Sequence, residues 1–361
     1  MVRVTVPVPG RAYDVTIGPG ILASADGLLP ALPGAMTAFV ISDRAVSDLY
    51  YGTLANALGD RGLASVLLLV PIGEEAKSLR GYESLLRQLA GREAHRDDAI
   101  LALGGGAVGD LAGFVASTYM RGVPFVQIPT TLTAQVDAAI GGKTAVNLPE
   151  GKNLVGTFAQ PIAVLADVDV LATLDQRDFL SGLAEVAKYA LTLDDELLAL
   201  LENDPAAVLS RDVVVMEDVI GRCVAAKARI VAEDERDANA RLVLNYGHTL
   251  GHALERLDAF QGRTHGEAVA IGMVFAAMLA ERRGLASGLS ARTERLLRSL
   301  GLEATKPLPA AEDVLRCLRL DKKYRGGVRF VLLEQVGHPV VVDGVSDAEV
   351  GSILLEMGAP V

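Results

Sequence analysis

The sequence predicts an α/β N-terminal domain with a mostly parallel sheet, followed by a mainly α-helical C-terminal domain. Up to about residue 170, short β-branched runs such as TAFVISD and DAILALGGG alternate with helical segments, a pattern typical of strands joined by crossover helices. Beyond that point, long segments of helical period dominate. Because 361 residues exceed the usual size of one domain, we expect two, residues 1–172 and residues 173–361.

The elements follow from local periodicity. In the first domain, MVRVTVPVPGRAYDV alternates like a strand and not like a signal peptide, and SLRGYESLLRQLAGRE repeats its apolar positions at helical spacing. Further strands are predicted at residues 37–43, 64–71, 98–106 and 124–131. In the second domain, helices are predicted at residues 177–193, 213–235, 266–284 and 290–301, and a hairpin at residues 327–345 before a final helix.

The composition disfavours several classes of protein. The 45 acidic residues outnumber the 34 basic ones, and the net charge of −11 disfavours nucleic-acid binding. Apolar runs are short and punctuated, which disfavours a membrane partner. Cys223 and Cys317 lack CxxC spacing, which is consistent with a reducing compartment. We expect both to be buried as small hydrophobic residues. We therefore expect a soluble, cytoplasmic protein.

A glycine-rich turn suggests a nucleotide site in the first domain. In LALGGGAVGDLAGFVAS an apolar strand runs through three glycines into a helix that begins near Gly109 and Asp110. Glycines let backbone N–H groups approach a pyrophosphate, and a helix N-terminus favours negative charge. The spacing differs from G-x-G-x-x-G, so a purely structural strand-to-helix turn is an equal alternative.

Three neighbouring segments add polar groups to this region. Asp43 ends a predicted strand, where a carboxylate can accept hydrogen bonds from a ribose. Glu74 and Lys77 stand three residues apart, as in either a ligand site or an ordinary salt-bridged helix start. Thr130 and Thr131 follow another strand, where their hydroxyl groups could reach a phosphate or a ribose.

A segment rich in lysine, DAAIGGKTAVNLPEGKNLVG, predicts an anion site. It carries Asp137, Lys143, Lys152 and Asn153 in a loop-like, glycine-containing stretch without the pattern of a solvated helix face. An anion that leaves bulk water needs such donors. We therefore expect this loop to bind phosphate or carboxylate.

Histidines and buried charges suggest a metal site in the second domain. In LNYGHTLGHALE, His248 and His252 are four residues apart and share one helix face, and His265 follows closely in a chain with five histidines. Glu185 and Lys188 lie one turn apart in an apolar helix. As alternatives, the histidines could be core residues with satisfied hydrogen bonds, and Glu185 and Lys188 could form an internal salt bridge. One carboxylate with two imidazoles is a common catalytic zinc set.

Taken together, these segments resemble the 3-dehydroquinate synthases, the cyclases of the shikimate pathway of aromatic amino acid biosynthesis. The resemblance runs from about residue 43 to residue 323. The matching segments are GEEAKS, GGGAVGD, TYMRG, PTTLTAQVD, GGKTAVN, GKNLVG, SGLAEVAK, LNYGHTLGHALE, HGEAVAIGM and LDKK. Their number and order imply an NAD- and metal-dependent, phosphate-eliminating carbon–oxygen lyase that acts as a homodimer on a phosphorylated sugar acid.

The resemblance also implies roles for single residues. The residues implied to bind NAD are Asp43, Glu74, Lys77, Gly105, Gly106, Val108, Gly109, Asp110, Thr130, Thr131, Lys143, Lys152 and Thr173. The implied ligands of one zinc or cobalt ion are Glu185, His248 and His265. The implied catalytic and substrate-binding residues are Asp137, Lys152, Asn153, Lys188, Lys227, Arg241, Asn245, His252, one of Lys322 and Lys323, and Arg121 from a partner subunit.

The implied substrate is 3-deoxy-D-arabino-heptulosonate 7-phosphate, whose phosphate and carboxylate would account for the basic residues. The chain departs from the family pattern at Ala138, Ala139, Ala190, Asn239 and Ala240, none of them an implied metal ligand. Other sugar-phosphate cyclases share the metal set, and a metal-dependent polyol or alcohol dehydrogenase would share the architecture but would need fewer cationic residues. A non-enzymatic nucleotide-binding protein would leave the glutamate and the two histidines unexplained.

Overall fold

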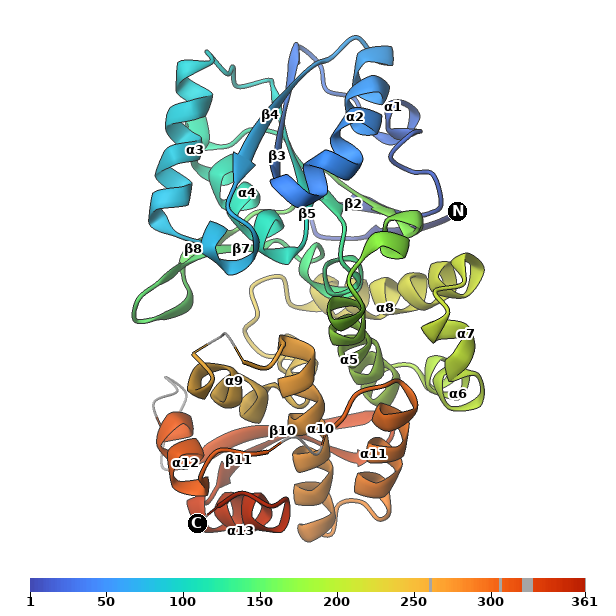
Figure 1. The fold of residues 1–361 in the computed structure, drawn as a ribbon, viewed down its shortest axis with the longest axis vertical. Helices are drawn as coiled ribbons and strands as arrows, with labels where there is room; N and C mark the ends of the chain where they lie inside the picture. The colour runs from blue at the N-terminus through green and yellow to red at the C-terminus, as the bar shows by residue number, and fades with distance from the viewer. Residues whose placement is uncertain (260–261, 305–306, 320–326, 361) are drawn as a thin grey trace. The chain divides into compact units, whose positions relative to one another are not determined.

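A computed structural model describes the chain except for residues 260–261, 305–306, 320–326 and 361. The chain forms two compact units (Figure 1). The first consists of Met1–Leu174 and Val213–Arg236, and the second of Asp175–Asp212 and Asp237–Val361. The predicted division after residue 172 thus lies two residues before Leu174, where the chain first passes from the first unit to the second. Residues 213–236, which were predicted in the second domain, belong to the first unit.

A seven-stranded sheet forms the centre of the first unit, in the order β1-β2-β9-β6-β5-β3-β4. Only the pair β1–β2 is antiparallel, so the predicted mostly parallel sheet is confirmed. Its strands are β1 (Val2–Val6), β2 (Tyr13–Gly18), β3 (Thr37–Asp43), β4 (Ala64–Val70), β5 (Ala99–Gly104), β6 (Phe125–Pro129) and β9 (Ala163–Asp167).

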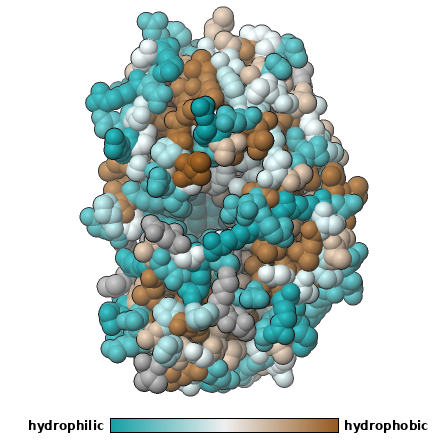
Figure 2. All heavy atoms as spheres, viewed as in Figure 1, coloured by the Kyte–Doolittle hydropathy of each residue, from teal (hydrophilic) through white to brown (hydrophobic). Residues whose placement is uncertain are grey.

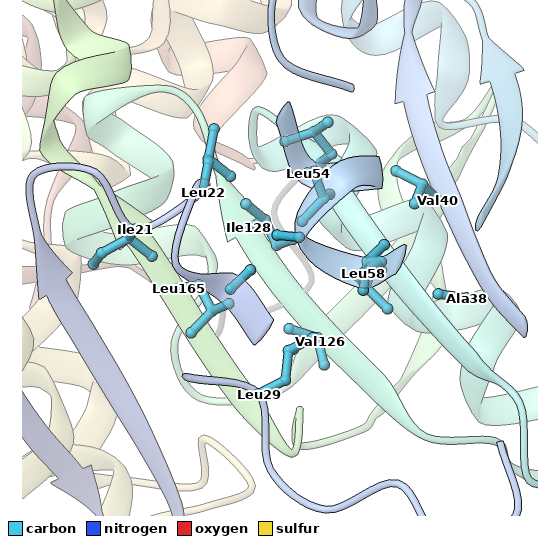
Figure 3. Close-up of a cluster of buried hydrophobic side chains, with 14 of the residues drawn as sticks. Ile21, Leu22, Leu29, Ala38, Val40, Leu54, Leu58, Val126, Ile128 and Leu165 are labelled. Atoms are coloured by element: carbon cyan, nitrogen blue, oxygen red, sulfur yellow. The ribbon is translucent and has the colours of Figure 1, made fainter. Parts of the chain in front are cut away.

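Helices cover both faces of this sheet because alternate side chains of each strand point to opposite sides. Figure 3 shows Leu54 and Leu58 packed with Val40 of β3 and Ile128 of β6 on one face. Phe39, the neighbour of Val40, packs on the other face. The helices of this unit are α1 (Ala25–Leu28), α2 (Arg44–Asp60), α3 (Leu79–Gly91), α4 (Gly106–Thr118) and α8 (Val213–Glu233), with short helical turns η1 (Gly73–Ala76), η2 (Tyr119–Arg121), η3 (Ala134–Ala138) and η4 (Val168–Thr173).

The lysine-rich segment is a two-stranded ribbon, and the expectation of a loop was wrong. Strands β7 (Lys143–Leu148) and β8 (Gly151–Phe158) pair antiparallel. Gly156 permits the close pairing, because a Cβ there would lie 2.1 Å from the carbonyl oxygen of Thr144. Glycines and lysines interrupt the alternation of apolar and polar residues that would otherwise have predicted the two strands.

The second unit is mainly helical, as predicted. Its longest helix, α10 (His265–Arg282), begins at a capping box formed by Thr264 and Glu267. The predicted hairpin and final helix are present as β10 (Val328–Gln335), β11 (His338–Val345) and α13 (Asp347–Glu356). The remaining elements are α5 (Gln176–Thr192), α6 (Asp195–Asn203), α7 (Pro205–Leu209), η5 (Ala240–Asn245), α9 (His248–Leu257), α11 (Leu289–Ser299) and α12 (Ala311–Arg319).

Helix α8 joins the first unit through its contacts with the N-terminal strand. A Cβ at Gly221 would lie 3.4 Å from a methyl carbon of Val2, and the N-terminal amine of Met1 lies 2.5 Å from Glu217. Local periodicity predicts the helix but not the core against which it packs.

Hydrophilic and hydrophobic residues are interspersed over the face drawn in Figure 2. Among the described helices, none has both the length and the apolar character that a membrane span requires.

Candidate active site

The glycine-rich turn lies between β5 and α4 in the first unit, with Gly105 at the N-cap of the helix. A Cβ at Gly104 would lie 2.7 Å from the side chain of Val108, and one at Gly109 would lie 2.6 Å from Oε1 of Gln127. Packing against Val108 therefore requires a glycine at position 104, a side chain at position 109 would displace the amide of Gln127, and the turn leaves backbone N–H groups at a helix N-terminus.

A buried hydroxyl beside this turn fits a ligand. Thr130 is 5% exposed, and its Oγ1 has no hydrogen-bond partner among the described residues. A buried polar atom without a partner is costly unless a ligand or water satisfies it. Thr131 lies against Gly105, since a Cβ there would meet its methyl group at 3.1 Å.

Lys77 contacts two other predicted site residues. Its Nζ lies 2.6 Å from Oδ2 of Asp110 and 2.6 Å from Oδ1 of Asn153. Burial raises the pKa of Asp110 although Lys77 opposes the shift. The alternative of a Glu74–Lys77 pair at a helix start was wrong, because Lys77 pairs with Asp110 instead.

Asn147 is a polar residue of this site that sequence reasoning missed. Its Nδ2 donates to Oε2 of Glu74 at 2.7 Å, its Oδ1 accepts from the backbone of Asn153 at 2.9 Å, and its own N–H donates to the carbonyl of Lys77 at 2.8 Å. Lys152 Nζ lies 3.9 Å from Oε1 of Glu74. Asn147 thus fixes the ribbon to η1, and its presence in the matching segment GGKTAVN was the available signal.

Asp137 and Lys227 form a second polar pair in the first unit. Lys227 Nζ donates to the carbonyl of Asp137 at 2.6 Å and lies 3.0 Å from its Oδ1. Asp137 lies in η3, a π-helical turn, a distortion that occurs frequently at functional sites.

Five further predicted residues of the first unit have clear positions. Asp43 caps α2 by accepting from the N–H of Val46 at 3.0 Å. Thr173 donates to the carbonyl of Val170 at 3.2 Å. Arg121 is exposed in η2 with a left-handed backbone, φ 66°. Lys143 is exposed at the start of β7, and a Cβ at Gly106 would lie 3.1 Å from the methyl of Ala138.

In the second unit, three helices bring Glu185, His248 and His265 together. Glu185 lies in the middle of α5, while His248 and His265 are the first residues of α9 and α10. Glycines allow these helices to approach closely. A Cβ at Gly272 would lie 1.9 Å from the carbonyl oxygen of Gly247, and one at Gly266 would lie 2.1 Å from that of Ser181.

The donor atoms of these residues lie within 4.8 Å of one another. Glu185 Oε1 is 3.0 Å from Nε2 of His265 and 3.3 Å from Nε2 of His248. His248 Nδ1 lies 3.1 Å from the carbonyl of Tyr246. Because a carbonyl only accepts, Nδ1 is the donor in this contact, and Nε2 is the ring nitrogen that faces the carboxylate. One carboxylate and two imidazole nitrogens that converge in this way form a donor set that fits a divalent metal ion.

The electrostatics of the cluster keep its carboxylate charged. Burial disfavours the ionised form of Glu185, but Lys188, whose Nζ lies 2.5 Å from Oε2, and the two histidines hold its pKa well below the usual value. Burial likewise opposes the charged form of His265, but hydrogen bonds to Glu185 and Glu255 raise the pKa of His265 to about 10. A divalent cation would replace a proton in this position.

Glu255 and Tyr246 are partners of the cluster that sequence reasoning missed. Oε2 of Glu255 lies 3.1 Å from Nδ1 of His265, so each histidine has an oxygen acceptor behind the nitrogen that faces Glu185. Such outer partners set the tautomer and orientation of metal-binding imidazoles. The spacing of Glu255, seven residues after His248 on one helix face, was an available signal.

The other predicted residues of the second unit lie in or near the same helices. His252 is on α9, and its ring centroid lies 5.4 Å from that of His248, which confirms that the two share a face. Arg241 is 2% exposed in η5, and Asn245 ends the same turn. The alternative of Asn245 as a helix cap was wrong, because Gly247 occupies the N-cap of α9. Lys322 and Lys323 lie outside the described residues.

Solved structures of similar fold define the class. A 2-deoxy-scyllo-inosose synthase complexed with carbaglucose-6-phosphate, NAD+ and Co2+ aligns with a TM-score of 0.89 and 30% identity over 98% of this chain and 99% of the other. A 2-epi-5-epi-valiolone synthase from Streptomyces hygroscopicus, with NAD+ and Zn2+ bound, aligns with a TM-score of 0.86 and 31% identity over 96% of each chain. An iron-containing alcohol dehydrogenase shares the fold alone, at 16% identity and a TM-score of 0.65. The fold is that of the sugar-phosphate cyclases.

Sequence relatives narrow the class. The 3-dehydroquinate synthase N-terminal family matches residues 67–181, and the corresponding C-terminal family matches residues 182–324. A 3-dehydroquinate synthase of Geobacter metallireducens is 46% identical over 93% of this chain and 94% of its own length. One of Caulobacter vibrioides is 44% identical over 99% of this chain and all of its own length. The chain belongs to the 3-dehydroquinate synthase family.

Proposed function

We propose that the chain is a 3-dehydroquinate synthase. It converts 3-deoxy-D-arabino-heptulosonate 7-phosphate to 3-dehydroquinate and phosphate by transient oxidation, phosphate elimination, re-reduction, ring opening and intramolecular aldol closure. The observation that carries this proposal is the near-full-length similarity to 3-dehydroquinate synthases, at 46% and 44% identity, against 30% and 31% for the two synthases that make other products.

The first unit is proposed to bind NAD, which would accept a hydride from the substrate and later return it. The turn before α4 supplies backbone N–H donors for the pyrophosphate, and Thr130 supplies the buried hydroxyl described above. Asp43 stands at the end of β3, where a carboxylate can accept from a ribose. Lys77 and Asp110 hold the ribbon residue Asn153 next to this region.

The second unit is proposed to hold one zinc or cobalt ion through Glu185, His248 and His265. A bound divalent metal would supply Lewis-acid polarisation of a substrate oxygen. Lys188 keeps Glu185 ionised, while Tyr246 and Glu255 orient the two imidazoles. His252 lies next to these rings and is proposed to move protons for the substrate.

The cationic residues suit a substrate with a phosphate and a carboxylate. Lys152, Lys188, Lys227 and Arg241 exceed the charge that an alcohol would require. Asp137, Asn153, Asn245 and one lysine of Lys322 and Lys323 complete the proposed set. This excess of positive groups favours the cyclase over a polyol dehydrogenase of similar architecture. We also infer that the enzyme acts in the cytoplasm, in keeping with its two free cysteines.

Cofactor stoichiometry tests the reaction. A dehydrogenase consumes one NAD for each product, whereas a cyclase that re-reduces the same carbon regenerates its cofactor. With the heptulosonate phosphate in large excess over NAD, we expect phosphate release to continue over many turnovers while NADH absorbance stays flat. A stoichiometric rise of NADH without phosphate would make the protein a dehydrogenase. Release of phosphate from glucose 6-phosphate at a comparable rate would instead favour another cyclase.

A homodimer is part of the proposal, with Arg121 acting in the partner's substrate site. Met120 and Arg121 both have left-handed backbones, at φ 48° and 66°, and Arg121 is exposed. Such strain often marks a functional turn. We expect Arg121→Ala and Lys152→Ala chains to be inactive alone and to regain partial activity when mixed, because some dimers then contain one intact site. If the mixtures stay as inactive as the two parent variants, Arg121 does not act in the partner's site. Mixed wild-type chains are the control for the exchange of subunits between dimers.

A further inference from the structure

The described residues contain a second group of possible metal ligands, which shares one member with the first. His252, Glu255 and His265 place one donor atom each within 4.8 Å of one another. Like the first group, this one offers two imidazoles and one carboxylate, a donor set that suits zinc and other borderline divalent cations. The two groups overlap at His265, whose opposite ring nitrogens face the carboxylates of Glu185 and Glu255.

The geometry favours a position on the Nδ1 side of His265. Glu255 Oε2 lies 3.1 Å from Nδ1, and the side chain of Glu255 is only 8% exposed. His252 stands three residues before Glu255 on α9, so both side chains leave the same face of the helix. The rings of His252 and His265 lie 6.1 Å apart between centroids and are inclined by 28°.

We propose that His252, Glu255 and His265 form a second, weaker divalent-metal position whose occupation inhibits the enzyme. The inference rests on the proposed function, because the first position is assigned there to the catalytic metal. Occupation of the second position withdraws His252 from the substrate and replaces the hydrogen bond between Glu255 and His265 with coordination. Excess zinc would therefore act as an inhibitor of the enzyme that zinc activates.

Three physical costs make the second position the weaker one. His252 is exposed and must lose side-chain freedom and hydration to coordinate a metal. The contact between Nδ1 of His265 and Oε2 of Glu255 must open before a metal ion can enter between these two atoms. Finally, two divalent cations on opposite sides of one imidazole repel each other. None of these costs applies in the same degree to the buried position at Glu185.

Zinc binding to the metal-free, full-length protein tests the proposal by equilibrium dialysis with elemental analysis. We expect wild type to take up one zinc tightly and a second at higher concentration. His252→Ala should keep the tight zinc and weaken the second by at least about tenfold, as loss of a ligand exceeds the effect of an outer partner. Glu255→Gln should also lose the second zinc, and the tight zinc should weaken because the acceptor behind His265 loses its charge.

The exposed histidines outside the cluster provide matched controls. His95→Ala and His338→Ala should retain both equivalents. Saturation of wild type at one zinc would refute the second position and leave the proposed function intact. A second zinc that persists in both His252→Ala and Glu255→Gln would place it elsewhere and also refute the inference. A tight zinc that survives His248→Ala would overturn the first ligand set, and this inference with it.

Activity provides an independent readout. Wild-type turnover should rise as the first zinc binds and fall again over the concentration range in which dialysis detects the second. His338→Ala should show the same rise and fall. Full wild-type activity with both equivalents bound would contradict inhibition by the second metal.

Discussion

Alanine in place of His248 is expected to remove both the bound metal and measurable turnover, whereas alanine in place of His252 should keep the metal and lose rate. His248 presents Nε2 to Glu185 at 3.3 Å, fixed by the carbonyl of Tyr246 behind it. Loss of this ligand should lower metal affinity by more than the roughly 10–100-fold that an outer partner costs. Elemental analysis and steady-state rates of the two variants measure the difference.

Metal removal from wild type is the matched experiment. A chelator should abolish activity, and zinc or cobalt should restore it, because a site with an open position exchanges its metal while the fold persists. Far-UV circular dichroism before and after chelation checks that the fold remains. Full activity in metal-free protein would contradict the metal assignment, and equal metal loss in the two histidine variants would show that their roles are not divided.

Gly272→Ala is expected to cause the largest loss of stability among glycine-to-alanine changes at the described positions of the second unit. The new Cβ would lie 1.9 Å from the carbonyl oxygen of Gly247 and 2.8 Å from its carbonyl carbon. Backbone atoms cannot rotate away as a side chain can, so α9 and α10 must separate. Overpacking of a core typically costs about 1–3 kcal/mol and occasionally more, and we expect the upper end.

The same change should weaken metal binding, because Gly247 directly precedes His248. Gly351→Ala in α13 is the control, since its Cβ would meet only Leu315, at 3.6 Å, and alanine favours a helix by up to about 1 kcal/mol over glycine. Denaturant unfolding and metal titration of both variants compare them. Wild-type stability in Gly272→Ala would show that the two helices separate without cost.

The sequence predicted most of the fold because its elements have strong local periodicity. The parallel strands ending at Asp43 and Gly104 and the long helix that begins at His265 are examples. The ribbon that carries Lys152 was missed because glycines interrupt its alternation. The assignment of α8 to the first unit depends on tertiary packing against Val2, which no local pattern encodes.

The candidate site was predictable to the extent that its side chains recur at helical spacing or in family segments. Glu185, His248 and His265 were identified in this way, and the structure places their donor atoms together. The carbonyl of Tyr246 is a backbone group that every residue possesses, so its role depends on the turn before α9. The Lys77–Asp110 pair joins residues 33 positions apart and follows from the packing of η1 on α4.

The return of the chain to the first unit at α8 has a consequence for synthesis and truncation. The chain crosses between the units three times, after Leu174, after Asp212 and after Arg236. A single cut therefore cannot release the first unit complete, and a fragment ending at Leu174 would expose the surface of β1 that α8 covers. The ribosome synthesises α8 more than two hundred residues after β1. We therefore expect β1 to be fully buried only late in translation.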